Sequence, residues 1–141
     1  MKQGKQNHYN GSAAEYRAAA WFLENGYMVW WPSVHQDAAD FMVSKSGKYR
    51  RIQVKKAAWS RRHRGSRRYY LQVVINRGTE GRRVYSAKDI DYVMAVDGER
   101  LWLIPFKSIR AARSLMLDKK GPAQLNQPTR LRYDPSEWRV V

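Results

Sequence analysis

The sequence contains no cysteine, which excludes disulfide bonds and metal sites built on thiolates. It has no apolar run long enough to cross a membrane and no secretory signal pattern. A glycine-rich phosphate loop, a zinc-finger pattern and internal repeats are missing as well. These absences favour an intracellular, cytoplasmic protein without a small-molecule cofactor.

Acidic residues are scarce. Asp and Glu number 12 against 27 Lys and Arg, which leaves a net charge of +15. Such an excess predicts an anionic partner, and nucleic acid is the usual one. An acidic membrane surface is the alternative partner. The lack of a membrane-spanning segment makes this alternative weaker. Hydrophobic residues make up 43%, enough for a folded core.

The length of 141 residues fits one domain with a modest core. Residues Met1 to Asn10 are polar and basic without periodicity, which indicates a flexible arm. The single domain is then expected to cover residues 11–141.

A predicted hairpin organises the rest of the chain. Phe41 to Val43 is short and apolar, and Ser44 to Lys48 contains Gly47, which suits a tight turn. Tyr49 to Lys56 then alternates in polarity, as a strand does. Pairing of these two strands brings Asp40, at the start of the first, near the end of the second.

The second strand presents two polar side chains on one surface. Successive strand residues change face, so Gln53 and Lys55 point one way while Ile52 and Val54 point the other. An acid at position 40, an amide and a lysine are therefore expected to meet at one spot.

This spacing resembles the PD-(D/E)XK nuclease superfamily, in which an Asp opens one strand and an acid-X-Lys follows on the next. Small members include archaeal-type Holliday junction resolvases and intron-encoded homing endonucleases. The resemblance covers roughly residues 10 to 110, with Gly11–Val29 similar to the first helix and strand, and Ile90–Pro105 to a later hairpin. The sequence departs from the pattern at Gln53, where the family usually has an acid, so the resemblance implies a variant site.

The resemblance implies an α/β (α+β) fold with a restriction-endonuclease-like core. We expect a central mixed sheet of about five strands flanked by helices, with Glu15 on the first helix. Ser12 and Glu15 have capping-box spacing, which predicts that this helix begins at Ser12, and Gly26 should end it. Glu15 is then a cap carboxylate, a metal ligand or both.

Other elements follow from local pattern. We expect strands with strong β propensity, one of them central, a hairpin with an Asp97-Gly98 turn, a basic loop, and a helix with an apolar stripe. In chain order these are the strand Tyr27–Trp31, the loop Ala57–Arg68, the central strand Tyr69–Ile75, the hairpin Tyr92–Ile104 and the helix Lys107–Leu117.

By the same resemblance, the catalytic residues are Glu15, Asp40, Gln53 and Lys55. Mg²⁺, with Mn²⁺ as a substitute, would be held by Asp40, Gln53, the main-chain carbonyl of Val54 and Glu15. Lys55 would orient the attacking water or offset charge on the phosphate. Asp37 is the rival for the metal-binding aspartate, but Asp40 directly precedes the apolar strand.

Arginines crowd the loop that follows this strand. Their planar guanidinium groups suit phosphate oxygens. The predicted DNA-binding residues are Lys56, Arg61, Arg62, Arg64, Arg67 and Arg68. The function expected is metal-dependent cleavage of branched DNA by a homodimeric Holliday junction resolvase. The alternatives are a homing endonuclease of the same superfamily and a DNA-binding protein without activity.

Overall fold

The computed structural model describes residues 3–34, 38–61, 69–75, 85–109, 114–120 and 135–141. Its elements are two α-helices, eight strands and a 3-10 turn within those ranges. In chain order they are α1 (Gln3–Glu24), β1 (Met28–Trp30), β2 (Phe41–Lys45), β3 (Lys48–Lys56), β4 (Ala58–Arg61), β5 (Tyr69–Val74), β6 (Tyr92–Asp97), β7 (Arg100–Pro105), α2 (Phe106–Ile109), β8 (Ser114–Lys120) and η1 (Pro135–Trp138). No helix among the described residues is long and apolar enough to cross a membrane.

A mixed five-stranded sheet with the order β1-β2-β3-β6-β7 forms the centre of the fold. Within it β3 and β6 pair in parallel, and the other neighbours are antiparallel. The expected α/β (α+β) core with a five-stranded mixed sheet is confirmed. The predicted hairpins also form: β2 pairs with β3, and β6 pairs with β7.

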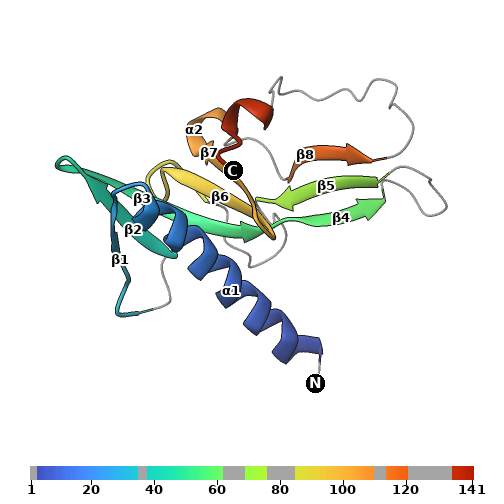
Figure 1. The fold of residues 1–141 in the computed structure, drawn as a ribbon, viewed down its shortest axis with the longest axis horizontal. Coiled ribbons are helices and arrows are strands. Elements are labelled where there is room, and N and C mark those ends of the chain that lie inside the picture. The colour runs from blue at the N-terminus through green and yellow to red at the C-terminus, as the bar shows by residue number, and fades with distance from the viewer. Residues whose placement is uncertain (1–2, 35–37, 62–68, 76–84, 110–113, 121–134) are drawn as a thin grey trace.

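The two faces of this sheet bury different partners (Figure 1). On one face, α1 packs its alanines and Phe22 against Ile52 and Val54 of β3. On the other face, Val93 and Ala95 of β6 belong to the core that includes the second sheet. Because neighbouring strand residues alternate, Gln53 and Lys55 lie on this second face.

The first helix begins at Gln3, well before the expected Ser12. Its early turns are polar, and side chains four residues apart bond to each other: Gln3 to Asn7 at 3.3 Å and Gln6 to Asn10 at 3.1 Å. Ser12 is therefore inside the helix and not its cap. Residues 3–10 project beyond the sheet as helix (Figure 1), so the expected helix start at Ser12 was wrong, while the flexible arm stays a prediction.

The end of α1 agrees with expectation. Gly26 has a φ of 81°, and the Tyr27 N–H donates to the Phe22 carbonyl at 2.9 Å. A residue with positive φ just beyond the last turn is the usual way for a helix to satisfy its final carbonyls.

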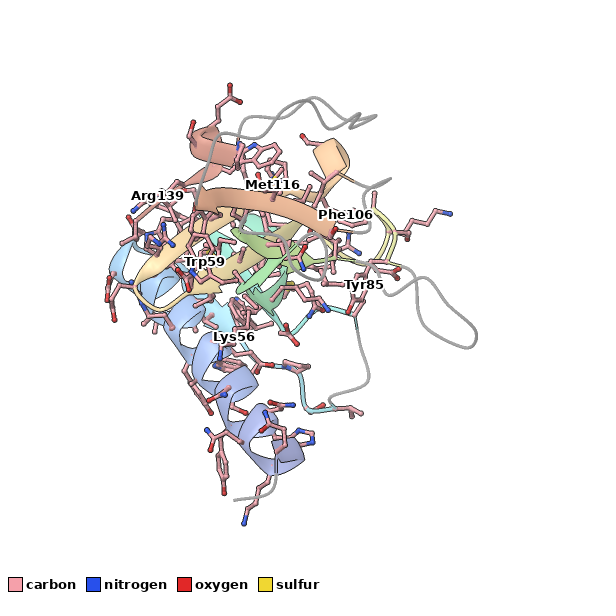
Figure 2. All side chains as sticks on the ribbon, turned by 90° about the vertical axis from the view of Figure 1, so that its right-hand side faces the viewer. Lys56, Trp59, Tyr85, Phe106, Met116 and Arg139 are labelled. Atoms are coloured by element: carbon pink, nitrogen blue, oxygen red, sulfur yellow. The ribbon has the colours of Figure 1, made fainter. Side chains whose placement is uncertain are left out.

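A second sheet, with the order β4-β5-β8, was not expected. The predicted strand Tyr69–Ile75 is the middle strand of this sheet and not of the larger one. Ala58–Arg61, expected in a loop, is its edge strand β4, while residues 62–68 lie outside the described ranges. Figure 2 views the molecule from the side of this sheet, with Met116 labelled on β8.

The helix expected over Lys107–Leu117 is wrong from Ser114 onward, while residues 110–113 lie outside the described ranges. Its last part, from Ser114, is strand β8, paired antiparallel with β5. Leu115 and Leu117 are buried and share one side of the strand. The helix was predicted from the spacing of Ile109, Ala112 and Met116, whereas the two-residue spacing of Leu115 and Leu117 suits a strand face, and pairing with β5 decides for the strand.

Candidate active site

The turn between β2 and β3 sets the register of the site. Ser46 and Gly47 form a two-residue loop between the paired Lys45 and Lys48, and both have positive φ, at 53° and 76°. This is the backbone of a type I′ turn, whose twist matches that of the strands. Phe41 then pairs with Ile52, so the positions of Asp40 and Gln53 face each other just beyond that pair.

The Asp40 carboxylate binds the end of β3. Its Oδ2 atom accepts a hydrogen bond from the Val54 N–H at 2.7 Å and another from Gln53 Nε2 at 2.9 Å. The Asp40 N–H donates to the Ile52 carbonyl at 2.8 Å. The acid and the amide that the sequence placed together are therefore in direct contact.

Gln53 is the one buried polar residue of the described core, 7% exposed. Its Nε2 atom donates a second bond, to the Val54 carbonyl oxygen at 3.1 Å. The positively polarised end of the amide thus lies where two oxygens converge, one from Asp40 and one from Val54.

The groups at this point suit a hard divalent cation as ligands. A carboxylate and a main-chain carbonyl offer oxygens, which Mg²⁺ prefers, and the Gln53 amide adds a third oxygen when it turns that atom to the place that Nε2 now occupies. The described residues hold no cluster of three or more His, Asp or Glu side chains. A metal at this point would therefore rest on Asp40, the Val54 carbonyl and the oxygen of Gln53, with a low site charge.

Lys55 contacts a tyrosine that the sequence analysis missed. Its Nζ donates to the Tyr85 hydroxyl at 3.1 Å and lies 5.0 Å from the centre of the Tyr85 ring. Tyr85 is labelled in Figure 2. A hydroxyl and a π face together restrict the ammonium group. Thirty positions separate the two residues, so no local pattern could have indicated the pair.

An ion pair beside the site was also missed. Arg51 binds Asp91 with its side chain at 3.1 Å and with its own N–H at 2.7 Å. The Arg51 guanidinium also donates to the carbonyls of Ala87 and Lys88. These contacts attach the turn before β6 to β3, next to Tyr85.

The ion pair changes both pKa values. Its hydrogen bond to Asp91 raises the pKa of Arg51. Burial alone raises the pKa of Asp91, but the hydrogen bonds and charge of Arg51 outweigh it, so that pKa lies below its usual value. A depressed carboxyl pKa stabilises the fold above the unfolded-state pKa, and this contribution disappears as pH falls through the folded-state pKa.

Glu15 is half-buried on α1, next to the buried Ala14, and α1 packs on the Ile52–Val54 face of the sheet. The role of Glu15 as a metal ligand stays a prediction.

The predicted DNA-binding residues are described only in part. Lys56 is exposed at the end of β3, and Arg61 ends β4. Residues 62–68, which contain Arg62, Arg64, Arg67 and Arg68, lie outside the described ranges, as does the rival Asp37.

One comparison with known proteins gives the family, and two others give a similar sequence and a similar fold. A family model described as PD-(D/E)XK endonuclease matches residues 5–140. Protein 5.3 of Escherichia phage T7 is 27% identical over 116 residues, which are 82% of this chain and 94% of that protein. The solved structure of a bacterial homing endonuclease, I-Ssp6803I, aligns with a TM-score of 0.68 at 18% identity, covering 92% of this chain and 85% of that one.

Proposed function

Because the chain belongs to the PD-(D/E)XK endonuclease family, we propose that it is a metal-dependent DNA endonuclease that cuts branched DNA, most readily four-way junctions, as a homodimer. The observation that carries the nuclease assignment is the contact of Asp40, Gln53 and Val54 at one point, with Lys55 on the same face of β3.

Each of these groups has a task in phosphodiester hydrolysis. Mg²⁺, or Mn²⁺ in its place, supplies a water of lowered pKa and neutralises phosphate charge when bound. Asp40 and the Val54 carbonyl hold that cation, and Gln53 adds its amide oxygen. Lys55, restrained by Tyr85, offsets charge on the phosphate or orients the attacking water. Glu15 would complete the metal site.

The choice of branched DNA rests on charge and on the kind of elements present. A net charge of +15 favours binding to the phosphate backbone whatever its sequence. Among the described residues the helices are α1, the four-residue α2 and one 3-10 turn. That set offers no helix pair of the kind that reads a major groove. Recognition of DNA shape by a dimer, with two sites cutting two strands symmetrically, fits these features.

A homing endonuclease is the second candidate, favoured by the structural similarity to one. Such an enzyme reads a long duplex site, so it would cut a defined linear sequence. A DNA-binding protein without activity is the third, suggested by the neutral Gln53.

One experiment separates the three. We expect the protein with Mg²⁺ to nick a four-way junction and to leave a linear duplex of the same arm sequences intact, with EDTA abolishing cutting. Sedimentation should give twice the 16.6 kDa chain mass. Equal affinity for both substrates with cutting at one linear sequence would favour the homing endonuclease. Salt-dependent binding with no nicking in Mg²⁺ or Mn²⁺ would favour the third candidate, a DNA-binding protein without activity.

The Gln53→Glu variant tests the metal site by two measurements. A carboxylate binds Mg²⁺ better than an amide does, so we expect cleavage with a lower half-saturating metal concentration. Without metal, the new carboxylate would face Asp40 where Gln53 now donates, and like charges at that distance repel. We therefore expect a melting temperature a few degrees below that of the parent in EDTA, and recovery on adding Mg²⁺.

Gln72→Glu is the matched control, because it makes the same change on β5, away from Asp40. It should leave both the metal titration and the metal dependence of melting unchanged. If Gln53→Glu left them unchanged as well, Gln53 would not be a ligand.

A further inference from the structure

A pocket of about 390 Å³ opens on the sheet beside the candidate active site. Its walls are aromatic and apolar, with Trp30, Trp31 and Met42 among them, and its rim includes Arg51, Lys88 and Asp89. This volume is within the range of small-molecule sites. None of the roles given above to the active-site residues uses this pocket.

One side of the pocket belongs to the face that carries the metal-binding groups, and its other side, with Trp31 and Phe41, lies toward α1. Trp30 pairs with Met42, and Met42 pairs with Arg51, so these three side chains form a row on one face. Arg51 precedes Gln53 by two residues, which places both on that face about 7 Å apart along the strand. Two further lining residues, Ala39 and Phe41, flank Asp40. A nucleotide next to the scissile phosphate is within reach of the pocket.

The two tryptophans are exposed and held in place. Trp30 is 45% exposed and Trp31 is 44% exposed. Trp30 Nε1 donates to Ser44 Oγ at 3.0 Å. The Trp31 ring lies between Tyr16 and Phe41, with ring centres 5.4 and 5.1 Å away. Aromatic side chains that are exposed and already immobilised lose little conformational entropy when a ligand binds to them. This combination is typical of binding surfaces.

The chemistry of the pocket suits a flat, uncharged ring with a phosphate attached. Arg51 is paired with Asp91, and Asp89 offsets part of the positive charge of the lining. The pocket therefore does not present an uncompensated cationic site. Lys88 is exposed at the rim and can meet a backbone phosphate. Tryptophan faces stack on any base, at a cost in unstacking that is least where the DNA is already unpaired.

We propose that this pocket binds an unstacked nucleobase of the DNA, one or two nucleotides from the phosphate that is cut. The inference deepens the proposed function and rests on it. It also supplies a reason for preferring branched DNA, because bases at a branch point leave their stack more readily than bases in a duplex.

The test uses junctions that carry 2-aminopurine at the branch, a base whose fluorescence falls when it stacks on an aromatic ring. Binding is measured in EDTA, apart from cleavage. For the parent we expect quenching on binding. For Trp30→Ala we expect about tenfold weaker junction binding and loss of the quenching, while Trp30→Phe should restore both in part.

Trp59→Ala is the matched control, because Trp59 is similarly exposed, at 41%, but lies on β4 outside the pocket lining. It should keep the parental quenching of 2-aminopurine on binding. Trp30 forms no part of the two described core clusters, so Trp30→Ala should keep the parental melting temperature.

Three results would overturn the proposal. Unchanged affinity and quenching in Trp30→Ala, in a parent that cuts junctions, would reject the pocket alone and leave the nuclease function intact. A change from dimer to monomer in Trp30→Ala, with DNA binding per chain unchanged, would make the pocket a contact between two copies. A parent that neither binds nor cuts DNA would reject the proposed function and the pocket together.

Discussion

Replacing Asp40 by asparagine is expected to reduce DNA cleavage at least about 100-fold, with junction binding unchanged or tighter. Asp40 brings a carboxylate to the point where Gln53 and Val54 meet. Its loss removes the charge that holds a cation, and the loss of one such electrostatic group typically costs about two to three orders of magnitude. Binding should not suffer, because a negative charge near the DNA phosphates is removed as well.

The Asp40→Asn variant should fold normally. The oxygen of the new side-chain amide can take the place of Oδ2 and accept from both the Val54 N–H and Gln53 Nε2. Circular dichroism and melting would verify this. The control is Asp97→Asn, which makes the same charge change at the β6–β7 turn, where Asp97 pairs with Arg100 at 2.7 Å. It should cut at the parental rate.

Cleavage by Asp40→Asn at the rate of the parent would mean that the site is misplaced. Asp37 would then be the next candidate, and Asp37→Asn would be the variant to measure. Glu15→Gln, assayed in the same series, tests whether the carboxylate on α1 takes part in cleavage.

Replacing Lys55 by methionine is expected to lower the cleavage rate about 100-fold at saturating DNA. Methionine keeps most of the side-chain length and removes the ammonium group that Tyr85 holds at 3.1 Å. Single-turnover cleavage, with all the DNA bound, separates this loss from weaker binding. Tyr85→Phe keeps the ring and removes the hydroxyl, so it should lower the rate less than Lys55→Met does and leave metal affinity unchanged.

Lys56→Met is the matched control, because it makes the same substitution one residue later. Strand alternation points Lys56 away from the face of Lys55. It should weaken DNA binding. The slope of log affinity against log salt concentration should fall by about one unit, as expected for the loss of one phosphate contact. Its rate at saturating DNA should equal that of the parent. Equal rate losses in the two variants would show that general positive charge, and not the position of Lys55, matters.

Much of the fold was predictable where neighbours in sequence decide the structure. The β2–β3 hairpin and the positions of Asp40, Gln53 and Lys55 on it follow from a two-residue turn and strand alternation. The predictions failed where distant segments compete. The apolar spacing of Lys107–Leu117 suits a helix. Ser114–Lys120 nevertheless forms β8, because β5 pairs with it. Similarly, residues 3–10 looked irregular, although bonds between side chains four apart support a helix there.

The sequence by itself therefore determined the local chemistry, which is an acid, an amide and a lysine on one short hairpin. It also determined the strong positive charge of the chain. Only the tertiary structure decided what surrounds them. It placed Tyr85 on Lys55, attached Asp91 to Arg51, packed α1 against Ile52 and Val54, and assembled the tryptophan pocket beside Asp40. Turn type and alternation act over a few bonds, so spacing reveals them. Contacts between distant segments depend on which strands pair and which faces are buried, and those choices are made by the whole chain at once.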